Sequence, residues 1–216
     1  MIGLIYKTQP YQETNRMLFV YTKKGKKTLI ARGSQRLSSE LRLISQYLNL
    51  IEFYDNGKKM QSLTDAKLLD DYQKIKKDFF KTKLVAAMLE AIDKVRDEEI
   101  DHELVLEELI KSINSNNLNA ATLSFLIKLI SQAGYAPNFE ADGRVVRGFN
   151  LELGIIVYEK DVISIDLNVQ ETIILMKLLN LDVNDLEEID QNYFESISQF
   201  IKKYYEYHLR VSLKNI

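Results

Sequence analysis

Cationic and aromatic residues are interleaved in the first part of this 216-residue sequence, and this pattern has the clearest chemical meaning. The nine cationic residues are Lys7, Arg16, Lys23, Lys24, Lys26, Lys27, Arg32, Arg36 and Arg42. The flat side chains among them are Tyr11, Phe19 and Tyr21. Cations neutralise backbone phosphates, and aromatic rings stack on bases of any sequence for about 1 to 3 kcal/mol per base. The pattern therefore predicts a nucleic-acid surface built from these cations, with the three rings as candidates for base stacking.

Two arginines are the strongest candidates within this set. Lysines in a hairpin turn often serve only solubility, and aromatic residues in barrel strands often belong to the core. In contrast, Arg32 and Arg36 flank a short loop that contains Gly33. A planar guanidinium suits phosphate oxygens, which it binds through two parallel hydrogen bonds. We expect both arginines to lie with the lysines on one exposed side of the folded domain.

The charge of the chain is divided unevenly. Residues 1–78 contain 15 Lys and Arg against 8 Asp and Glu, whereas residues 79–216 contain 14 against 23. The formal net charge of -2 is therefore the sum of +7 in residues 1–78, here called the basic front, and -9 in residues 79–216. Such an asymmetry indicates a polyanionic partner for the front.

The sequence shows no activated nucleophile, phosphate loop or metal site. A phosphate loop needs a glycine five residues before its Gly-Lys pair, but Val20 and Glu52 stand at that position before the two Gly-Lys pairs of this chain. His102 and His208 are far apart without spaced partner ligands, and there is no cysteine to form a thiolate metal site. The sequence therefore predicts a protein that is not an enzyme and that binds no metal or cofactor.

No apolar run approaches the roughly 18 to 20 residues that a membrane span requires. The apolar stretch at the start of the chain is also too short for a signal peptide. The absence of cysteine gives no sign of an oxidising compartment. We therefore expect a cytoplasmic protein without a membrane partner.

The first 75 residues carry five short runs of apolar, aromatic and β-branched residues, which are typical of strands. The runs are Leu4–Tyr6, Met17–Tyr21, Thr28–Ala31, Tyr47–Phe53 and Met60–Thr64. The connections at 23–26 and 55–58 contain glycine and have hairpin character. Five short strands in this length fit a small OB-like barrel.

From about residue 75 the apolar spacing changes from a period of 2 to a period of 3.6. Helices are predicted within 84–95, 106–113, 123–130, 169–181 and 193–211. The region 141–167 returns to β-like alternation around three glycines. The sequence thus predicts an α+β protein: an N-terminal OB-fold β-barrel at 1–75, then a mainly α-helical domain at 76–216 with a small β insertion near 141–167.

Residues 3–18 at the opening of the chain read GLIYKTQPYQETNRML. This stretch resembles the start of RecO recombination mediators, in which a first strand ends in Lys-Thr, a short loop carries Tyr and an acidic residue, and Arg-Leu begins the next strand. Further matches in family order are Gly25-Lys26, Ala31-Arg32-Gly33, Arg36, and the closing residues Tyr207-His208-Leu209 with Leu213-Lys214. The similarity covers nearly the whole chain.

One feature of the family pattern is missing. Many RecO proteins carry a four-cysteine zinc site after a Gly-Tyr-x-Pro segment, which 134–137 resembles here. The residues near the positions of those cysteines are Asp142, Val145, Val157 and Lys160. The resemblance therefore implies a form without zinc, in which ordinary strand pairing and packing hold the β insertion.

The resemblance implies a mediator of DNA repair and recombination. Such a protein binds single- and double-stranded DNA, anneals complementary strands, and helps load recombinase on SSB-coated DNA together with RecR. Its implied partners are DNA, RecR and the acidic and apolar C-terminal tail of the single-stranded-DNA-binding protein SSB. A pocket for that tail needs a cation beside it, and the helical candidates are Lys128, Lys202, Lys203 and Arg210.

Two other functions remain open at the level of sequence. One is an OB-fold RNA-binding module, and the other is a protein-interaction adapter whose basic front meets an acidic protein. Comparing DNA and RNA oligomers of equal length separates the first from a DNA mediator. The absence of any nucleic-acid shift at about 50 mM salt, where phosphate contacts are strong, would favour the adapter.

Overall fold

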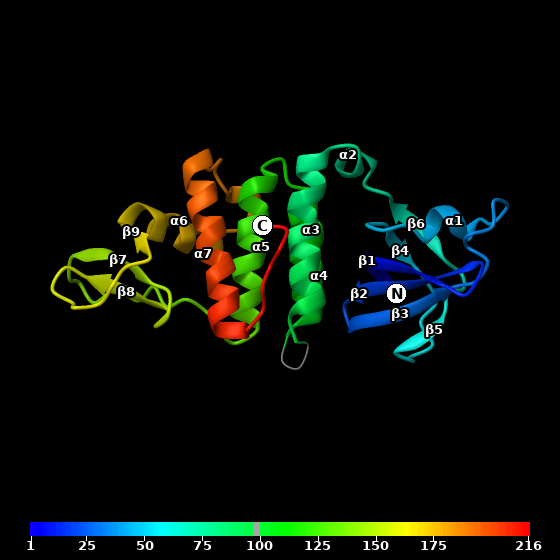
Figure 1. Cartoon of the computed structure of the whole chain (residues 1–216), viewed down its shortest axis with the longest axis horizontal. Helices are drawn as coiled ribbons and strands as arrows, with labels where there is room; N and C mark the ends of the chain where they lie inside the picture. Colours follow the sequence, from blue (N-terminus) through cyan, green and yellow to red (C-terminus); the bar gives the residue numbers. More distant parts are fainter. Residues whose placement is uncertain (97–99) are drawn as a thin grey trace. The chain divides into compact units, whose positions relative to one another are not determined.

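The computed structural model describes residues 1–96 and 100–216 (Figure 1). The chain forms two compact units, one comprising 1–79 with 101–107 and the other comprising 80–100 with 108–216. The first is built on a curled sheet and the second on helices with a small sheet. The predicted α+β fold class is therefore confirmed.

The first unit contains a six-stranded sheet in the order β5-β3-β2-β1-β4-β6. Its strands are β1 (Ile2–Tyr11), β2 (Asn15–Thr22), β3 (Gly25–Ala31), β4 (Leu50–Glu52), β5 (Met60–Ser62) and β6 (Lys67–Asp70). All neighbouring strands are antiparallel except β3 and β5, which are parallel. Two four-residue helices, α1 (Leu41–Ile44) and α2 (Gln73–Lys76), complete the unit.

The sheet curls into a half-barrel because the chain after β4 meets the chain around β5. The backbone N–H of Tyr54 donates to the carbonyl of Thr64 at 3.3 Å. The Gln61 side chain adds two bonds, since its Nε2 donates to the Tyr54 carbonyl and its Oε1 accepts from the Asn56 N–H. The curled sheet and its strand order are consistent with an OB fold.

Side chains alternate between the inside and the outside of this half-barrel, as the period of a strand requires. The buried core consists of Ile5, Leu18, Val20, Leu29, Ala31, Ile51, Phe53 and Leu63. In β2, Leu18 and Val20 point inward, so Met17 and Phe19 belong to the outer face. This burial of apolar residues sets the register that places the polar outer face.

The five predicted strands are all present, and the structure adds details that the pattern missed. The 23–26 connection is a tight hairpin in which Gly25 has a φ of 88°. The 55–58 connection does not join ladder partners, because β5 pairs in parallel with β3. The strand β6 escaped prediction because it is short and mostly exposed, at the edge of the sheet.

The remaining elements of the chain are mainly helical, as predicted. The helices are α3 (Phe79–Lys94), α4 (His102–Ile113), α5 (Leu118–Gln132), α6 (Val169–Asn180), the short 3₁₀ helix η1 (Val183–Asp185) and α7 (Gln191–Leu209). Helix α5 is buried on nearly all sides and packs against α6 and α7. It begins with an N-cap at Asn117, whose side chain accepts from the Ala120 N–H, and the chain turns at Gly134 with a φ of 90°. Among the described residues no helix is long and apolar enough to cross a membrane.

The predicted β insertion is a three-stranded antiparallel sheet, β8-β7-β9. Its strands are β7 (Val146–Asn150), β8 (Ile155–Tyr158) and β9 (Leu167–Asn168). Beside this sheet, the Arg144 guanidinium pairs with Asp142 at 2.7 Å and with Asp161 at 2.9 Å. It also lies 3.9 Å from the centre of the Tyr158 ring. A charge cluster on one arginine thus connects the segments that flank β7 and β8.

Candidate nucleic-acid interface

The structure places the predicted cations at two ends of the sheet rather than in one cluster. Strand β3 has 7 residues, and at about 3.3 Å per residue its ends are roughly 20 Å apart. We call the β2–β3 hairpin with Lys23, Lys24, Lys26 and Lys27 the lysine end. We call the opposite end, with Arg16, Arg32, Arg36 and Arg42, the arginine end. Strand β3 thus separates the two groups along the sheet, and their position on one exposed side of the domain stays a prediction.

At the lysine end, acidic partners among the described residues hold Lys23, Lys24 and Lys27. Lys23 pairs with Glu103 at 3.2 Å, and Lys24 lies 3.5 Å from Asp55. Lys27 is only 7% exposed and pairs with the same Asp55 at 2.5 Å. The hydrogen bond from Lys27 holds the pKa of Asp55 below its ordinary value. Lys27 is therefore buried and paired, and is not the exposed phosphate-binding cation that the sequence predicted.

Tyr21, predicted as a stacking ring, is covered by another side chain of the same unit. Its ring is 2% exposed, and the His102 ring lies against it edge-on at 5.6 Å. The Tyr21 hydroxyl and His102 Nδ1 are 2.9 Å apart. Gly25 is needed beside them, since a Cβ there would come within 2.9 Å of the His102 ring. Tyr21 therefore anchors the hairpin, and its burial removes it from the candidates for base stacking.

The outer face of β1, β2 and β3 joins the two ends. Lys7 lies opposite Phe19 across the strands, with its ammonium 5.3 Å from the ring centre. Phe19 also contacts Tyr6 at 6.3 Å between ring centres, and it stays half-exposed. OB folds bind oligonucleotides on the face formed by their strands 2 and 3. Lys7 and Phe19 thus remain candidates on this face.

The arginine end forms where the β1–β2 turn adjoins the end of β3. Pro10 lies opposite Arg16, and Arg16 lies opposite Ala31, so the residues after β3 begin beside this turn. The Gly33 N–H donates to Asn15 Oδ1 at 2.8 Å, and the Gln35 N–H donates to the Thr14 carbonyl at 2.9 Å. These bonds fix the loop that carries the arginines against the turn.

The guanidiniums of this end are available to a ligand. Arg32, Arg36 and Arg42 are exposed, and within residues 1–96 and 100–216 none of them has an ion pair. Arg16 is half-buried and donates from Nη1 to the Ser45 carbonyl at 3.4 Å. Tyr11, at the end of β1, is half-exposed beside the turn. Four cations and one aromatic ring thus gather around one edge.

The orientation of Arg42 is set by a network beneath α1. Asn49 Nδ2 donates to the carbonyls of Leu43 and Ile44 at 2.7 and 3.1 Å, which caps the short helix. Asn49 Oδ1 in turn accepts from Lys76 Nζ at 2.6 Å. A buried amide therefore holds the helix that displays Arg42, which no local pattern in the sequence revealed.

Two further cations in the 53–59 loop were missed by the sequence reasoning. Lys58 and Lys59 are exposed between β4 and β5. This loop corresponds to one of the two loops that OB folds use with oligonucleotides. The glycine of the 55–58 turn predicts the turn itself. Its lysines were missed because lysines in a turn often serve only solubility.

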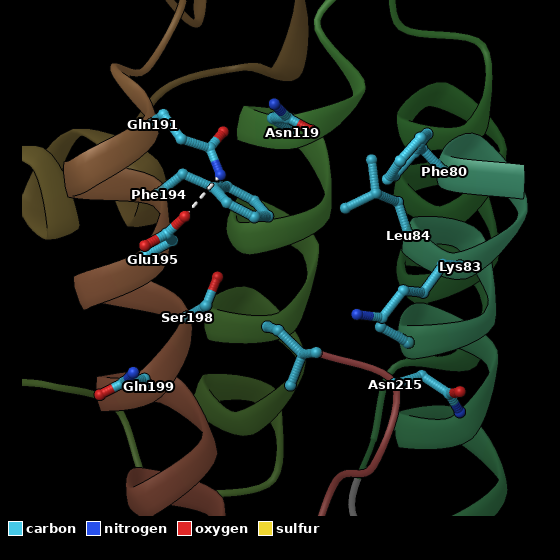
Figure 2. Close-up of a pocket in the computed structure, with 12 residues that line it drawn as sticks. Phe80, Lys83, Leu84, Asn119, Gln191, Phe194, Glu195, Ser198, Gln199 and Asn215 are labelled. Atoms are coloured by element: carbon cyan, nitrogen blue, oxygen red, sulfur yellow. Dashed lines mark hydrogen bonds between the residues drawn. The ribbon is translucent and has the colours of Figure 1, made fainter.

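The helical unit holds a separate groove of about 600 Å³ between α3 and α7 (Figure 2). Phe80, Leu84 and Phe194 supply apolar walls, and the Lys83 side chain extends into the space between the helices. Gln191 donates to Glu195 at 2.8 Å on the opposite wall. A groove with apolar side chains on both walls and Lys83 on one of them suits a partly apolar peptide whose negative charge lies beside Lys83 and away from Glu195.

Sequence models of two consecutive domains match this chain. The model described as "Recombination protein O N terminal" matches residues 1–72, and the model described as "Recombination protein O C terminal" matches residues 76–215. The chain belongs to the RecO family. The match covers both the curled sheet and the helices, so the resemblance inferred from short motifs is confirmed.

Several RecO relatives are similar to the chain, and each is named "DNA repair protein RecO". The relative from Oceanobacillus iheyensis is 27% identical over 62% of this chain and 55% of its own length. That from Clostridium perfringens is 29% identical over 64% of the chain and 59% of its own length. That from Alkaliphilus metalliredigens is 24% identical over 99% of the chain and 95% of its own length. The chain thus spans little more than half the length of some RecO relatives and nearly all of another.

Proposed function

We propose that this chain is a DNA repair and recombination mediator that binds single- and double-stranded DNA and anneals complementary strands. In this role it works with RecR to load recombinase on SSB-coated DNA. Membership of the RecO family supports the proposal. The observation that carries it is the arginine end, where exposed guanidiniums with no ion pair in the described part of the chain lie at one edge of an OB-like sheet.

The arginine end suits a strand of any sequence. Guanidiniums bind phosphate oxygens, which every nucleotide offers, and Tyr11 adds a flat face beside them. From there the outer face of β1 and β2 leads past Lys7 and Phe19. The proposed DNA surface therefore comprises Lys7, Tyr11, Arg16, Phe19, Arg32, Arg36 and Arg42, with Lys23, Lys24 and Lys26 as weaker contributors.

Annealing on such a surface needs no covalent step. Two DNA strands repel each other, and cations that neutralise their phosphates reduce this repulsion and raise the local strand concentration. Base pairing then drives formation of the duplex. If about six phosphates are contacted, affinity falls a few hundredfold between about 50 and 200 mM salt. We propose that the chain accordingly acts without a catalytic residue.

The decisive experiment is annealing of two complementary oligonucleotides that are coated with SSB, with and without this chain. We expect the chain to accelerate duplex formation, and RecR to be required for recombinase to load on the same substrate. An annealing rate that the chain leaves unchanged on both bare and SSB-coated strands would refute the proposal. RNA oligomers of equal length serve as the comparison that separates a DNA mediator from an RNA-binding module.

We place the SSB tail in the groove between α3 and α7. Of the cations considered from sequence, Lys128 is half-buried and pairs with Glu108 at 3.2 Å, while Arg210 lies over the Tyr207 ring at 6.0 Å. Lys83 instead extends between apolar walls, as an acidic and apolar tail requires. This geometry favours Lys83 as the cation beside the pocket.

Binding of a fluorescent SSB tail peptide to the full chain tests this placement. Lys83→Glu should weaken binding about tenfold, because it replaces an attractive charge by a repulsive one. Lys203→Glu, at an exposed position of α7, is the matched control and should bind like the unmodified chain. Loss of binding in the control with retention in Lys83→Glu would move the tail site away from this groove.

A further inference from the structure

One apolar side chain stands out among the cations of the arginine end. Leu37 is 85% exposed, the highest value for a large apolar residue among those described in the first unit. It follows Arg36 directly, and Leu43 in α1 is a second leucine of this end, at 67% exposed. In Figure 1 the segment before α1 protrudes as a loop beyond the strands. The chain therefore presents an apolar tip between guanidiniums.

The loop that carries Leu37 is braced rather than loose. Its base is tied to the β1–β2 turn, where Gln35 Nε2 donates to the Asn15 carbonyl at 2.7 Å. Three successive turns then run from Gly33 to Arg42, through backbone bonds from Arg36 to Gly33, from Ser39 to Arg36 and from Arg42 to Ser39. Ser34 beneath the loop is fully buried. Bracing of this kind fixes the backbone that carries the exposed leucine.

Single exposed apolar residues are common on protein surfaces and usually need no explanation. Leu37 differs because it combines near-complete exposure, a fixed base and flanking cations that have no ion pair among the described residues. Proteins that kink or unstack nucleic acid use the same combination, in which cations hold the backbone and an apolar wedge enters between bases. The surroundings of Leu37 thus match the requirements for a wedge.

We propose that Leu37 inserts between neighbouring bases of a DNA strand held by Arg32, Arg36 and Arg42. This inference rests on the proposed function, since it needs DNA at the arginine end. The guanidiniums hold phosphates on either side of the wedge, and burial of the leucine side chain offsets the loss of base stacking. A strand opened in this way presents unstacked bases for pairing with a complementary strand.

The chain contains no tryptophan, so Leu37→Trp introduces a single indole as a reporter. The probe is a thymidine oligonucleotide of about 20 residues, with binding followed separately by the anisotropy of a dye at its end. We expect tryptophan emission to be quenched by about half or more, with the same concentration dependence as the anisotropy change, because an inserted indole stacks on bases. Leu153→Trp, at a 58% exposed position of the second unit, is the matched control and should keep its emission.

The outcomes separate the wedge from the proposed function. Full anisotropy change with unaltered Leu37→Trp emission overturns the wedge alone and leaves DNA binding intact, with Leu37 then assigned to a protein partner. No anisotropy change for the unmodified chain overturns DNA binding, and the wedge falls with it. As a supporting test, Leu37→Ala should bind DNA about three- to tenfold more weakly, with an unchanged salt slope. It should also cause a smaller rise in the fluorescence of 2-aminopurine placed in the DNA strand.

Discussion

The arginine end and the lysine end of the N-terminal sheet carry equal numbers of predicted cations, but the structure uses them differently. At the lysine end, Asp55 and Glu103 pair with lysines of the hairpin, and Lys27 is buried. At the arginine end, Arg32, Arg36 and Arg42 are exposed without ion pairs among the described residues. The difference shows that cation density in a sequence does not measure the positive charge available to a ligand.

The residue type agrees with this division. Lysine is a compact ammonium that can enter the rim of a barrel and meet one carboxylate, as Lys27 does with Asp55. Arginine presents a rigid planar fork that matches phosphate. We infer that the lysine end mainly stabilises the hairpin and that the arginine end mainly binds DNA. The predictions below test this division.

The largest expected effect is loss of stability at the lysine end. Asp55→Ala leaves the buried Lys27 ammonium, among the residues that the structure describes, with the Lys58 carbonyl at 3.3 Å as its remaining partner, so unfolding free energy should fall by about 2 to 3 kcal/mol. This is less than the roughly 3 to 5 kcal/mol of a fully buried pair because the exposed 56–59 loop lets water approach. Denaturant unfolding measures the change. Asp55→Ala with Lys27→Met should recover much of the loss, and no recovery would contradict a local charge effect.

The second effect concerns DNA affinity. Arg32→Glu with Arg36→Glu removes two proposed phosphate contacts, each worth about fivefold at about 0.1 M salt, so single-strand affinity should fall about 25-fold or more. The salt slope should decrease by about 1.4. Lys23→Glu with Lys24→Glu makes the same change in net charge at the lysine end and should cost much less. Equal losses in the two double variants would remove the distinction between the ends.

The contrast between the two ends shows how far the sequence alone can lead. Five strands of the first unit and the five longer helices were predictable because apolar periodicity is local, and the glycine at 25 marked the hairpin correctly. Whether each cation is paired could not be predicted from the sequence, because Lys27 meets a partner 28 residues away and Lys23 meets one that is 80 residues away. The His102 ring that covers Tyr21 is likewise distant in sequence. Pairing of this kind depends on the completed fold.

A third, smaller effect is a dependence of stability on pH that belongs to the lysine end. The pKa of Asp55 lies below its ordinary value of 3.8 in the folded chain, chiefly through its bond with Lys27. Its stabilising contribution is therefore complete above the unfolded pKa of about 3.9 and is lost as pH falls through the lower folded value. Unfolding free energy measured from about pH 5 to pH 3 should fall less steeply for Asp55→Asn than for the unmodified chain. Parallel curves would show that Asp55 does not couple folding to protonation.

The smallest effect concerns a paired arginine of the second unit, Arg144, which serves as a comparison for the arginines of the arginine end. Arg144 is exposed but bonded to Asp142 and Asp161, and these bonds lower the pKa of Asp142 and raise that of Arg144. Such an arginine should act in the small sheet and not in DNA binding. Arg144→Gln should speed amide hydrogen exchange in β7 and β8 while leaving DNA affinity and its salt slope unchanged. A loss of affinity equal to that of the Arg32 and Arg36 variant would show that ion pairing does not remove an arginine from the DNA surface, and the assignment of the two ends would then need another physical basis.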